Sequence, residues 1–250
     1  MLRVVVVDSP EHAGRLAGDA VAAVVAGAQR PVLGLATGSS PRPVYDELAR
    51  RVDDDSLSLA RTRAFLLDEY LGLLSDDPRS YRAEIEREVV ECTDLPSAAV
   101  RGLDGAASDV EAECCAYERS IRDAGGIDLQ LLGVGSDGHI GFNEPGSPLD
   151  SRTRPMELAP RTRQDNARFF DGDVEQVPAH CLTQGIATIL EAGELLLLAF
   201  GGSKAEAIRQ AVEGPVCERW PVTALQRHPH VTVLVDRAAG SLLERADSTA

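Results

Sequence analysis

The sequence is poor in aromatic residues and has no long hydrophobic run. Phenylalanine, tryptophan and tyrosine make up only 4% of its 250 residues, whereas hydrophobic residues as a whole make up 44%. The chain is therefore apolar enough to bury a core, which must consist mainly of aliphatic side chains. No apolar stretch reaches the length that a membrane-spanning helix needs, so we expect no membrane partner. No signal peptide is predicted, because the valine run after Arg3 ends at Asp8.

Basic residues are also scarce. The chain has 25 lysines and arginines against 40 aspartates and glutamates, a net charge of −15. This balance argues against a nucleic-acid partner, although a few local cations and a helix N-terminus can still hold one anionic small substrate. The five cysteines are odd in number and lack zinc-ligand spacing, so we expect reduced thiols in a cytoplasmic protein. The segment His228-Pro229-His230 lacks evident partner ligands, and we interpret it as a loop rather than a metal site.

Predicted strands and helices alternate along the chain. The predicted strands lie at 2–7, 32–35, 63–67, 129–134, 195–200 and 231–235, and the predicted helices at 10–29, 41–49, 81–90, 106–124, 178–192 and from 204 onward. This order predicts a single α/β domain over residues 1–250, with an open, mostly parallel Rossmann-like sheet and helices on both faces. Residues 145–173 show little periodicity and are rich in arginine, so we expect a lid-like loop region within 145–190.

The segment 127–145 carries the most specific functional pattern. An apolar run, Leu129–Val134, leads into a turn that contains four glycines and three ionisable residues, Asp137, His139 and Glu144. Ligands of open α/β sheets bind beyond the carboxyl ends of the strands, so we look for the chemistry at this turn. The alternative interpretation is a glycine-rich loop with a solvated aspartate and a histidine whose hydrogen bonds are satisfied.

Three other predicted strands also end in polar residues. The loop Thr37-Gly38-Ser39-Ser40 precedes a helix, so its N–H groups and hydroxyls form either a phosphate cradle or an ordinary capped helix start. Asp68 follows the strand 63–67, where it faces either the same crevice or solvent. Lys204 begins a helix, a position where the helix dipole disfavours a cation, and this favours a role in anion binding.

Together these motifs resemble the glucosamine-6-phosphate deaminase family, from Val32 to Val235. The matching segments are Leu-Ala-Thr-Gly-Ser-Ser-Pro at 35–41, Leu-Asp-Glu-Tyr-Leu-Gly-Leu at 67–73, the turn 133–145, Ser-Arg-Thr-Arg at 151–154, Asn-Ala-Arg-Phe-Phe-Asp at 166–171, Gly-Ser-Lys at 202–204 and Ala-Val-Glu-Gly-Pro-Val at 211–216. The related 6-phosphogluconolactonases typically have an arginine where this chain has Tyr70, and they lack its Phe-Asn-Glu-Pro segment at 142–145. Both features favour the deaminase.

The resemblance implies amino sugar catabolism, in which glucosamine 6-phosphate and water give fructose 6-phosphate and ammonia. It implies that His139 opens the sugar ring, with Asp137 and Glu144 as its partners, and that Asp68 is the base at C2. The implied phosphate contacts are Gly38, Ser39, Ser40, Arg168 and Lys204. Neither a cofactor nor a metal is implied, the one implied partner is a small sugar phosphate, and a homo-oligomer is compatible with the family. The alternatives are a lactonase-like sugar-phosphate hydrolase and a non-catalytic sugar-phosphate sensor.

One departure from the family pattern concerns regulation. Allosteric bacterial members bind N-acetylglucosamine 6-phosphate between subunits through a Ser-Ser-Leu segment, the following Ser-Arg-Thr-Arg and a lysine two residues later. Here Ser147 and Arg154 match that pattern, but Pro148 replaces the second serine and Met156 replaces the lysine. Proline offers neither a hydroxyl nor an N–H donor, so the resemblance implies that activation is absent.

Overall fold

The computed structural model describes residues 2–244. Its strands are β1 (Leu2–Val7), β2 (Val32–Leu35), β3 (Arg63–Leu66), β4 (Asp68–Tyr70), β5 (Val100–Arg101), β6 (Leu129–Leu132), β7 (Arg154–Glu157), β8 (His180–Thr183), β9 (Glu194–Ala199) and β10 (Val231–Asp236). Its α-helices are α1 (Pro10–Gly27), α2 (Arg42–Asp53), α3 (Tyr81–Ile85), α4 (Val110–Ala124), α5 (Pro160–Asn166), α6 (Ile186–Leu190) and α7 (Ala205–Glu213). A π-helical turn, Glu86–Val90, follows α3, and short 3-10 turns lie at Ser97–Ala99, Ala167–Phe169, Val174–Gln176, Gly202–Lys204 and Pro221–Arg227.

The main sheet confirms the predicted fold class. Within residues 2–244 it contains seven strands in the order β1-β10-β9-β6-β2-β3-β5, and every neighbouring pair is parallel. After β2 the chain builds outward through β3 and β5, and it then returns through β6 to build the other half. The strand order therefore reverses between β2 and β6, where the loops that follow these strands diverge and leave a crevice.

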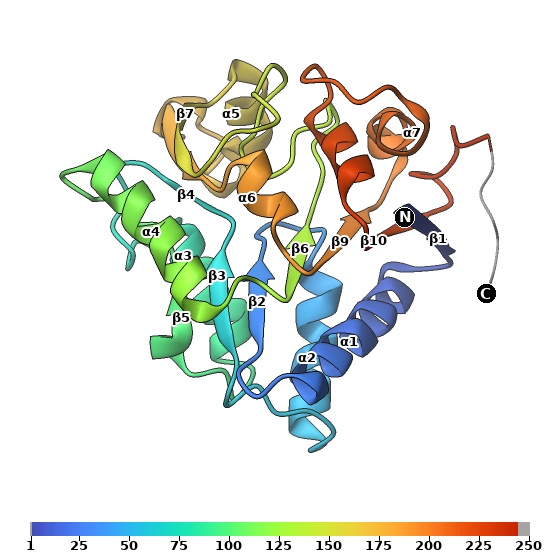
Figure 1. Cartoon of the computed structure of the whole chain (residues 1–250). Helices are drawn as coiled ribbons and strands as arrows, with labels where there is room; N and C mark the ends of the chain where they lie inside the picture. The colour runs from blue at the N-terminus through green and yellow to red at the C-terminus, as the bar shows by residue number, and fades with distance from the viewer. Residues whose placement is uncertain (1, 245–250) are drawn as a thin grey trace.

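Aliphatic side chains pack against both faces of this sheet. Successive residues of a strand point to opposite faces, so Leu196 and Leu198 of β9 join one core while Leu195 and Leu197 join the other. Helices α1, α2 and α3 cover the first core, and α4, α6 and α7 cover the second. Figure 1 shows the resulting layers, with the sheet between the helices. No helix within residues 2–244 has both the length and the apolar character of a membrane span.

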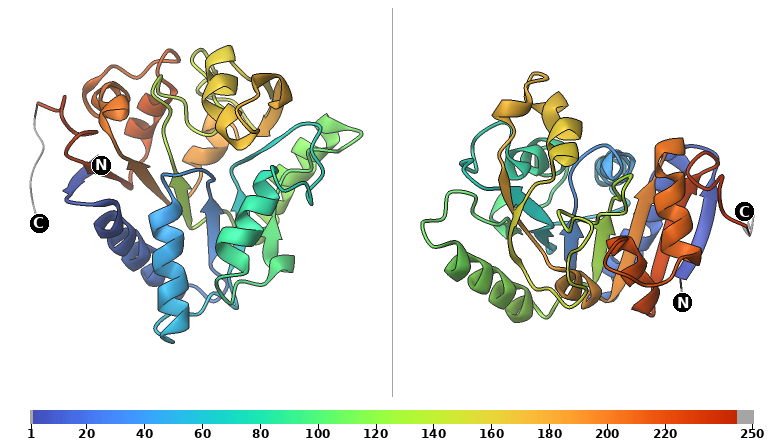
Figure 2. Two further views of the ribbon diagram at one scale, coloured as in Figure 1. Left: turned by 180° about the vertical axis from the view of Figure 1, so that it is seen from behind. Right: turned by 90° about the horizontal axis from the view of Figure 1, so that it is seen from above.

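A second sheet lies at one end of the first and was not predicted. It has the order β4-β8-β7, and both of its pairings are antiparallel. The views in Figures 1 and 2 show β7 and the neighbouring α5 as a separate layer beyond the main sheet. Asp68, expected at the end of the strand 63–67, instead begins β4, because the main-sheet strand β3 ends at Leu66. Asp68 is therefore held in register opposite Thr183 of β8.

Two sequence predictions in this region are wrong. The helix predicted over 178–192 is the strand β8 followed by the short helix α6, because pairing with both β4 and β7 outweighs local helix propensity. The segment 145–173, predicted to lack regular structure, contains β7 and α5. Pro155 concealed β7, since proline is tolerated in strands mainly at an edge, and β7 is the edge strand of its sheet. With seven residues, α5 is too short to show a helical period.

Candidate active site

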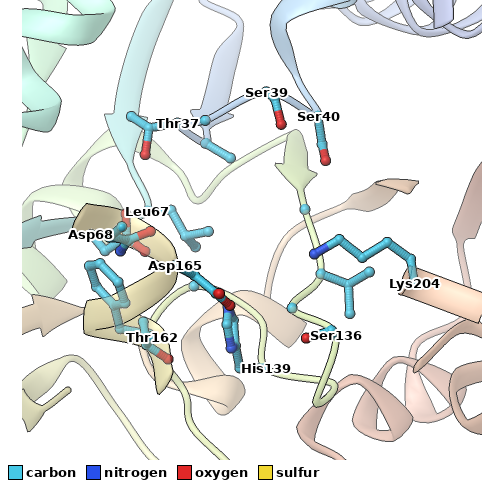
Figure 3. Close-up of a pocket in the computed structure, with 18 of the residues that line it drawn as sticks. Thr37, Ser39, Ser40, Leu67, Asp68, Ser136, His139, Thr162, Asp165 and Lys204 are labelled. Atoms are coloured by element: carbon cyan, nitrogen blue, oxygen red, sulfur yellow. The ribbon is translucent and has the colours of Figure 1, made fainter. Parts of the chain in front are cut away.

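A cavity of 490 Å³ occupies the crevice beyond β2 and β6. Its walls come from the loops after β2, β6 and β9, from the start of β4, and from α5 with the turn that follows it. The cavity is lined by seven of the nine candidate residues named above, namely Gly38, Ser39, Ser40, Asp68, His139, Arg168 and Lys204, whereas Asp137 and Glu144 lie behind its lining, next to His139. Figure 3 shows Asp68, His139 and Lys204 directed into this space from three sides.

The turn after β6 brings His139 against its own backbone. A Cβ atom added at Gly135 would lie 2.2 Å from Cε1 of the His139 ring, so only glycine leaves room for the imidazole there. The N–H of Gly135 donates to the carbonyl of His139 at 2.9 Å, which closes the turn. Nδ1 of His139 lies 2.8 Å from Oδ1 of Asp137, but the oxygen is out of line for a well-formed hydrogen bond, so the contact is chiefly electrostatic.

Asp137 stays ionised over a wide pH range. Burial alone would raise its pKa, but the close contact with the His139 ring, the charge of that ring and the backbone N–H of His139 outweigh burial and lower the pKa of Asp137 to about 2. Its Oδ1 also accepts the backbone N–H of His139 at 3.3 Å. A permanent carboxylate beside Nδ1 favours a proton on that nitrogen and leaves Nε2 as the nitrogen that exchanges a proton with a ligand.

Glu144 connects this turn to α5. Its Oε1 accepts hydrogen bonds from Thr162 Oγ1 at 2.6 Å and from the Ala159 N–H at 3.3 Å, while its Oε2 lies 3.8 Å from His139 Nδ1. One ligand atom from each of Asp137, His139 and Glu144 lies within 4.8 Å of the others, a spacing that is compatible with a cation. Glu144 already uses Oε1 on α5, whereas its Oε2 and Nδ1 of His139 are buried without a well-formed hydrogen bond, and the absence of a metal stays a prediction.

Asp68 is buried beside two other acidic residues. Burial raises its pKa well above the usual range, and the charges of Glu69 and Glu84 raise it further. Glu69, by contrast, turns away from the cavity. Its carboxylate accepts the backbone N–H groups of Tyr70, Tyr81 and Arg82 at 2.8, 3.0 and 2.9 Å. Asp68 is therefore the member of the pair that faces the cavity, with the raised proton affinity that a general base requires.

The loop after β2, residues 37–40, is named the phosphate loop after the phosphate contacts that the sequence predicts for it. It precedes α2, whose first-turn N–H groups carry the positive end of the helix dipole. The N–H groups of Ser39 and Ser40 find no acceptor within residues 2–244, so both are available to an anion. The N–H of Gly38 is not available, because it donates to Oε1 of Glu84 at 2.7 Å. Gly38 adopts φ +89°, a conformation that glycine permits at little cost.

Lys204 faces the phosphate loop across the cavity (Figure 3). Burial lowers its pKa, nearby Arg168 and Arg161 lower it further, and Asp165 and Asp137 partly offset the effect. The guanidinium of Arg168 stacks 4.7 Å from the ring centre of Phe169, at the rim of the same cavity. Lys204 and Arg168 thus add two positive charges to the cavity that the free N–H groups of Ser39 and Ser40 also face.

Three residues that shape the site were missed by the sequence reasoning. Thr162 and Asp165 lie on α5, inside the stretch that was predicted to be irregular, and both line the cavity. Glu84 lies on α3, 46 positions from its partner Gly38, and no local pattern links the two. A helical period over 160–166 would have placed Thr162 and Asp165 on one face, three residues apart, but the segment is too short for that signal to stand out.

Comparison with known proteins gives a consistent result. Over residues 9–234 the chain matches the family described as glucosamine-6-phosphate isomerases/6-phosphogluconolactonase. It is 56% identical to the glucosamine-6-phosphate deaminase of Beutenbergia cavernae and 54% identical to that of Mycolicibacterium smegmatis, each over 246 residues that cover 98% of this chain and 94% of the relative. A solved structure described as a monomeric glucosamine-6-phosphate deaminase superposes with a TM-score of 0.93 at 42% identity, covering 96% of this chain and 99% of that one. The 6-phosphogluconolactonase of Leishmania guyanensis gives a TM-score of 0.77 at 22% identity, covering 98% and 100%, and shares the fold.

Proposed function

The chain belongs to the family of glucosamine-6-phosphate isomerases and 6-phosphogluconolactonases, and we propose that it is a glucosamine-6-phosphate deaminase. The observation that carries the proposal is a single cavity in which Asp68 and the Asp137–His139 pair face the open N–H groups of the phosphate loop and Lys204. The net reaction converts glucosamine 6-phosphate and water into fructose 6-phosphate and ammonia. Because water is consumed and a C–N bond is broken, we classify the enzyme as an isomerising hydrolase.

Ring opening is the first step. The proton of the C1 hydroxyl leaves, a proton reaches the ring oxygen, and the C1–O5 bond breaks to give an aldehyde at C1. Nε2 of His139 takes up the first proton and returns one to the ring oxygen, while Asp137 at 2.8 Å stabilises the imidazolium that exists between these events. Glu144 adds a second carboxylate near Nδ1, at 3.8 Å, and ties the histidine turn to α5.

Asp68 carries the isomerisation. The C1 aldehyde acidifies the C2 proton, which passes to the Asp68 carboxylate, while the ammonium group at C2 gives a proton to the C1 oxygen. The product is an enolamine with its double bond between C1 and C2. Asp68 returns its proton to C1, which gives a protonated imine at C2. Water adds to the imine carbon and gives a proton to the nitrogen, and ammonia then departs with the C–N electron pair, which leaves the C2 ketone of fructose 6-phosphate. A raised pKa supports this role, since a stronger base removes a carbon-bound proton more readily.

The phosphate lies at the opposite end of the cavity. We place its oxygens on the N–H groups and hydroxyls of Ser39 and Ser40, with Lys204 and Arg168 as counter-charges. Gly38 contributes its backbone conformation, because its own N–H is used by Glu84. The segment 145–190 contributes α5 as a cover over the cavity, held to the histidine turn by the Thr162–Glu144 hydrogen bond. All five cysteines are unpaired, which fits a reducing compartment such as the cytoplasm.

The test is a direct assay of the products. Purified protein and glucosamine 6-phosphate, with EDTA present and no nicotinamide, should release ammonia and fructose 6-phosphate in equal amounts. The same preparation should hydrolyse 6-phosphogluconolactone no faster than the background rate. Hydrolysis of the lactone without ammonia release would favour the lactonase alternative. Binding of the amino sugar phosphate without turnover of either compound would favour the non-catalytic sensor.

A further inference from the structure

Glu84 touches no reacting atom, although its charge raises the pKa of Asp68, and its side chain contacts the phosphate loop. It projects from α3, and its Oε1 accepts the Gly38 N–H at 2.7 Å, the one hydrogen bond that its carboxylate makes within residues 2–244. Glu84 does not line the cavity, whereas Gly38 does. Its carboxylate therefore reaches the ligand site only through the backbone of the loop.

The helix that carries Glu84 is itself firmly placed. Ser80 caps α3 by accepting the Ala83 N–H at 3.0 Å, and Glu69 accepts the N–H groups of Tyr81 and Arg82 at 3.0 and 2.9 Å. Glu69 adjoins Asp68 in the sequence. Asp68 faces the cavity as the proposed base, and Glu69 anchors the first turn of α3. The helix thus fixes Glu84 relative to both ends of the site.

The contact fixes the most adaptable point of the phosphate loop. Gly38 has φ +89°, and a Cβ atom there would meet nothing within 4 Å, so backbone freedom rather than space explains the glycine. Upstream, Ala36 is held by Tyr45, whose hydroxyl donates to the Ala36 carbonyl at 2.5 Å and accepts its N–H at 3.2 Å. Glu84 anchors the backbone two residues further on, at Gly38. Without it, the glycine that leads into Ser39 and Ser40 has no hydrogen-bonded restraint on its N–H.

We propose that Glu84 is a positioning residue for the substrate's phosphate, because it holds Gly38 so that Ser39 and Ser40 present their N–H groups to the cavity. The proposal rests on the function proposed above. Burial raises the pKa of Glu84, and the Gly38 hydrogen bond opposes that rise, as expected for a carboxyl group kept in place by its acceptor role. The acceptor oxygen is thus the feature that matters, and glutamine offers an oxygen at the same position.

The experiment compares Glu84→Ala, Glu84→Gln and, as a matched control, Glu88→Gln, a carboxylate on the next turn that makes no side-chain hydrogen bond within residues 2–244. Glu84→Ala removes the acceptor of the Gly38 N–H, and a hydrogen bond to a charged acceptor is among the stronger ones. We therefore expect KM for glucosamine 6-phosphate to rise by roughly tenfold, with kcat changed by less than about threefold. Glu84→Gln and Glu88→Gln should keep KM within about threefold of the wild-type value.

A second readout does not require turnover. Inorganic phosphate, titrated into each variant by calorimetry, should bind Glu84→Ala roughly tenfold more weakly than the wild type, the glutamine variant or the Glu88→Gln control. The proposal is overturned by a Glu84→Ala variant with unchanged KM and phosphate affinity, by an equal loss in Glu84→Gln, or by a loss confined to kcat. If the wild type releases no ammonia, the proposed function fails, and the phosphate titration still decides the role of Glu84.

Discussion

Thr162 Oγ1 donates a 2.6 Å hydrogen bond to Oε1 of Glu144, and this bond joins α5 to the turn that holds His139. Both side chains are buried. The two residues come from different layers, since Glu144 follows the main-sheet strand β6 and Thr162 belongs to the layer built on β7 and β8. One hydroxyl thus couples the cover of the cavity to the histidine turn.

Thr162→Val should therefore affect both stability and catalysis. Valine keeps the shape of threonine but leaves a buried carboxylate oxygen with only the Ala159 N–H at 3.3 Å, which should cost about 1–3 kcal/mol in free energy of unfolding. The turnover of glucosamine 6-phosphate should fall as Glu144 shifts beside His139. Denaturant unfolding and the ammonia assay measure the two effects. Thr162→Ser keeps the hydroxyl and should retain most of both properties, and a fully stable valine variant would argue against this role.

Asp68→Asn should lower kcat by roughly 10²–10⁴-fold, the usual contribution of a general base, and should leave KM nearly unchanged. Exchange of the C2 hydrogen with solvent deuterium should be lost in parallel, because the same group removes that proton. In the wild type, kcat/KM should fall as the pH drops through the raised pKa of Asp68, since the protonated acid cannot act as a base. Wild-type exchange and turnover in the asparagine variant would remove Asp68 from this role.

The same substitution should stabilise the fold. Burial and the neighbouring Glu69 and Glu84 raise the pKa of Asp68, so the folded state favours the protonated acid more than the unfolded state does. Stability is therefore highest below the unfolded pKa of about 4 and declines as the pH rises through the raised folded value. Asparagine cannot ionise, so Asp68→Asn should have a higher Tm than the wild type at pH 8, and the difference should shrink toward pH 4. A constant or reversed difference would contradict this linkage.

The sequence predicts those parts of the molecule in which residues that are near in sequence also act together. Six main-sheet strands are aliphatic runs such as Leu195–Leu198, and polar turns follow several of them directly, so both are visible locally. The seventh, β5, has only two residues and was not predicted. The second sheet was missed because its strands are short and β7 contains Pro155, so only pairing in the folded chain defines them. The contacts of Glu84 with Gly38 and of Thr162 with Glu144 were missed because they join separate elements across 46 and 18 positions.

Lys204→Ala should weaken substrate binding more than it slows the chemistry, because the phosphate lies far from C1 and C2. A hydrogen bond to a charged group contributes about 1.5–3 kcal/mol, so KM should rise by roughly tenfold to a hundredfold while kcat changes less. Lys204→Arg is a useful comparison, since it keeps the charge and should recover part of the affinity. Steady-state kinetics measure both constants. An unchanged KM in the alanine variant would place the phosphate elsewhere in the cavity.

The last prediction is that N-acetylglucosamine 6-phosphate does not activate this enzyme. Of the residues that match the family's activator site, Ser147 is buried, and the Arg154 guanidinium donates to the Asn143 side chain at 2.9 Å. Pro148 and Met156 supply no donor for the phosphate, and two lost charged hydrogen bonds should cost several kcal/mol of activator binding, at about 1.5–3 kcal/mol each.

Allosteric coupling is typically only about 1–3 kcal/mol, so little activation should survive so large a loss of activator binding at ordinary concentrations. Substrate titrations with and without millimolar activator should therefore give the same hyperbolic curve. A sigmoidal curve that becomes hyperbolic, or a clear fall in half-saturation, would mean that other arginines of the 152–163 segment have rebuilt the site. Pro148→Ser combined with Met156→Lys provides the complementary test. Direct calorimetry should show that the double variant binds the activator more tightly than the wild type does. The gain requires the Arg154 guanidinium to exchange the Asn143 side chain for the activator's phosphate.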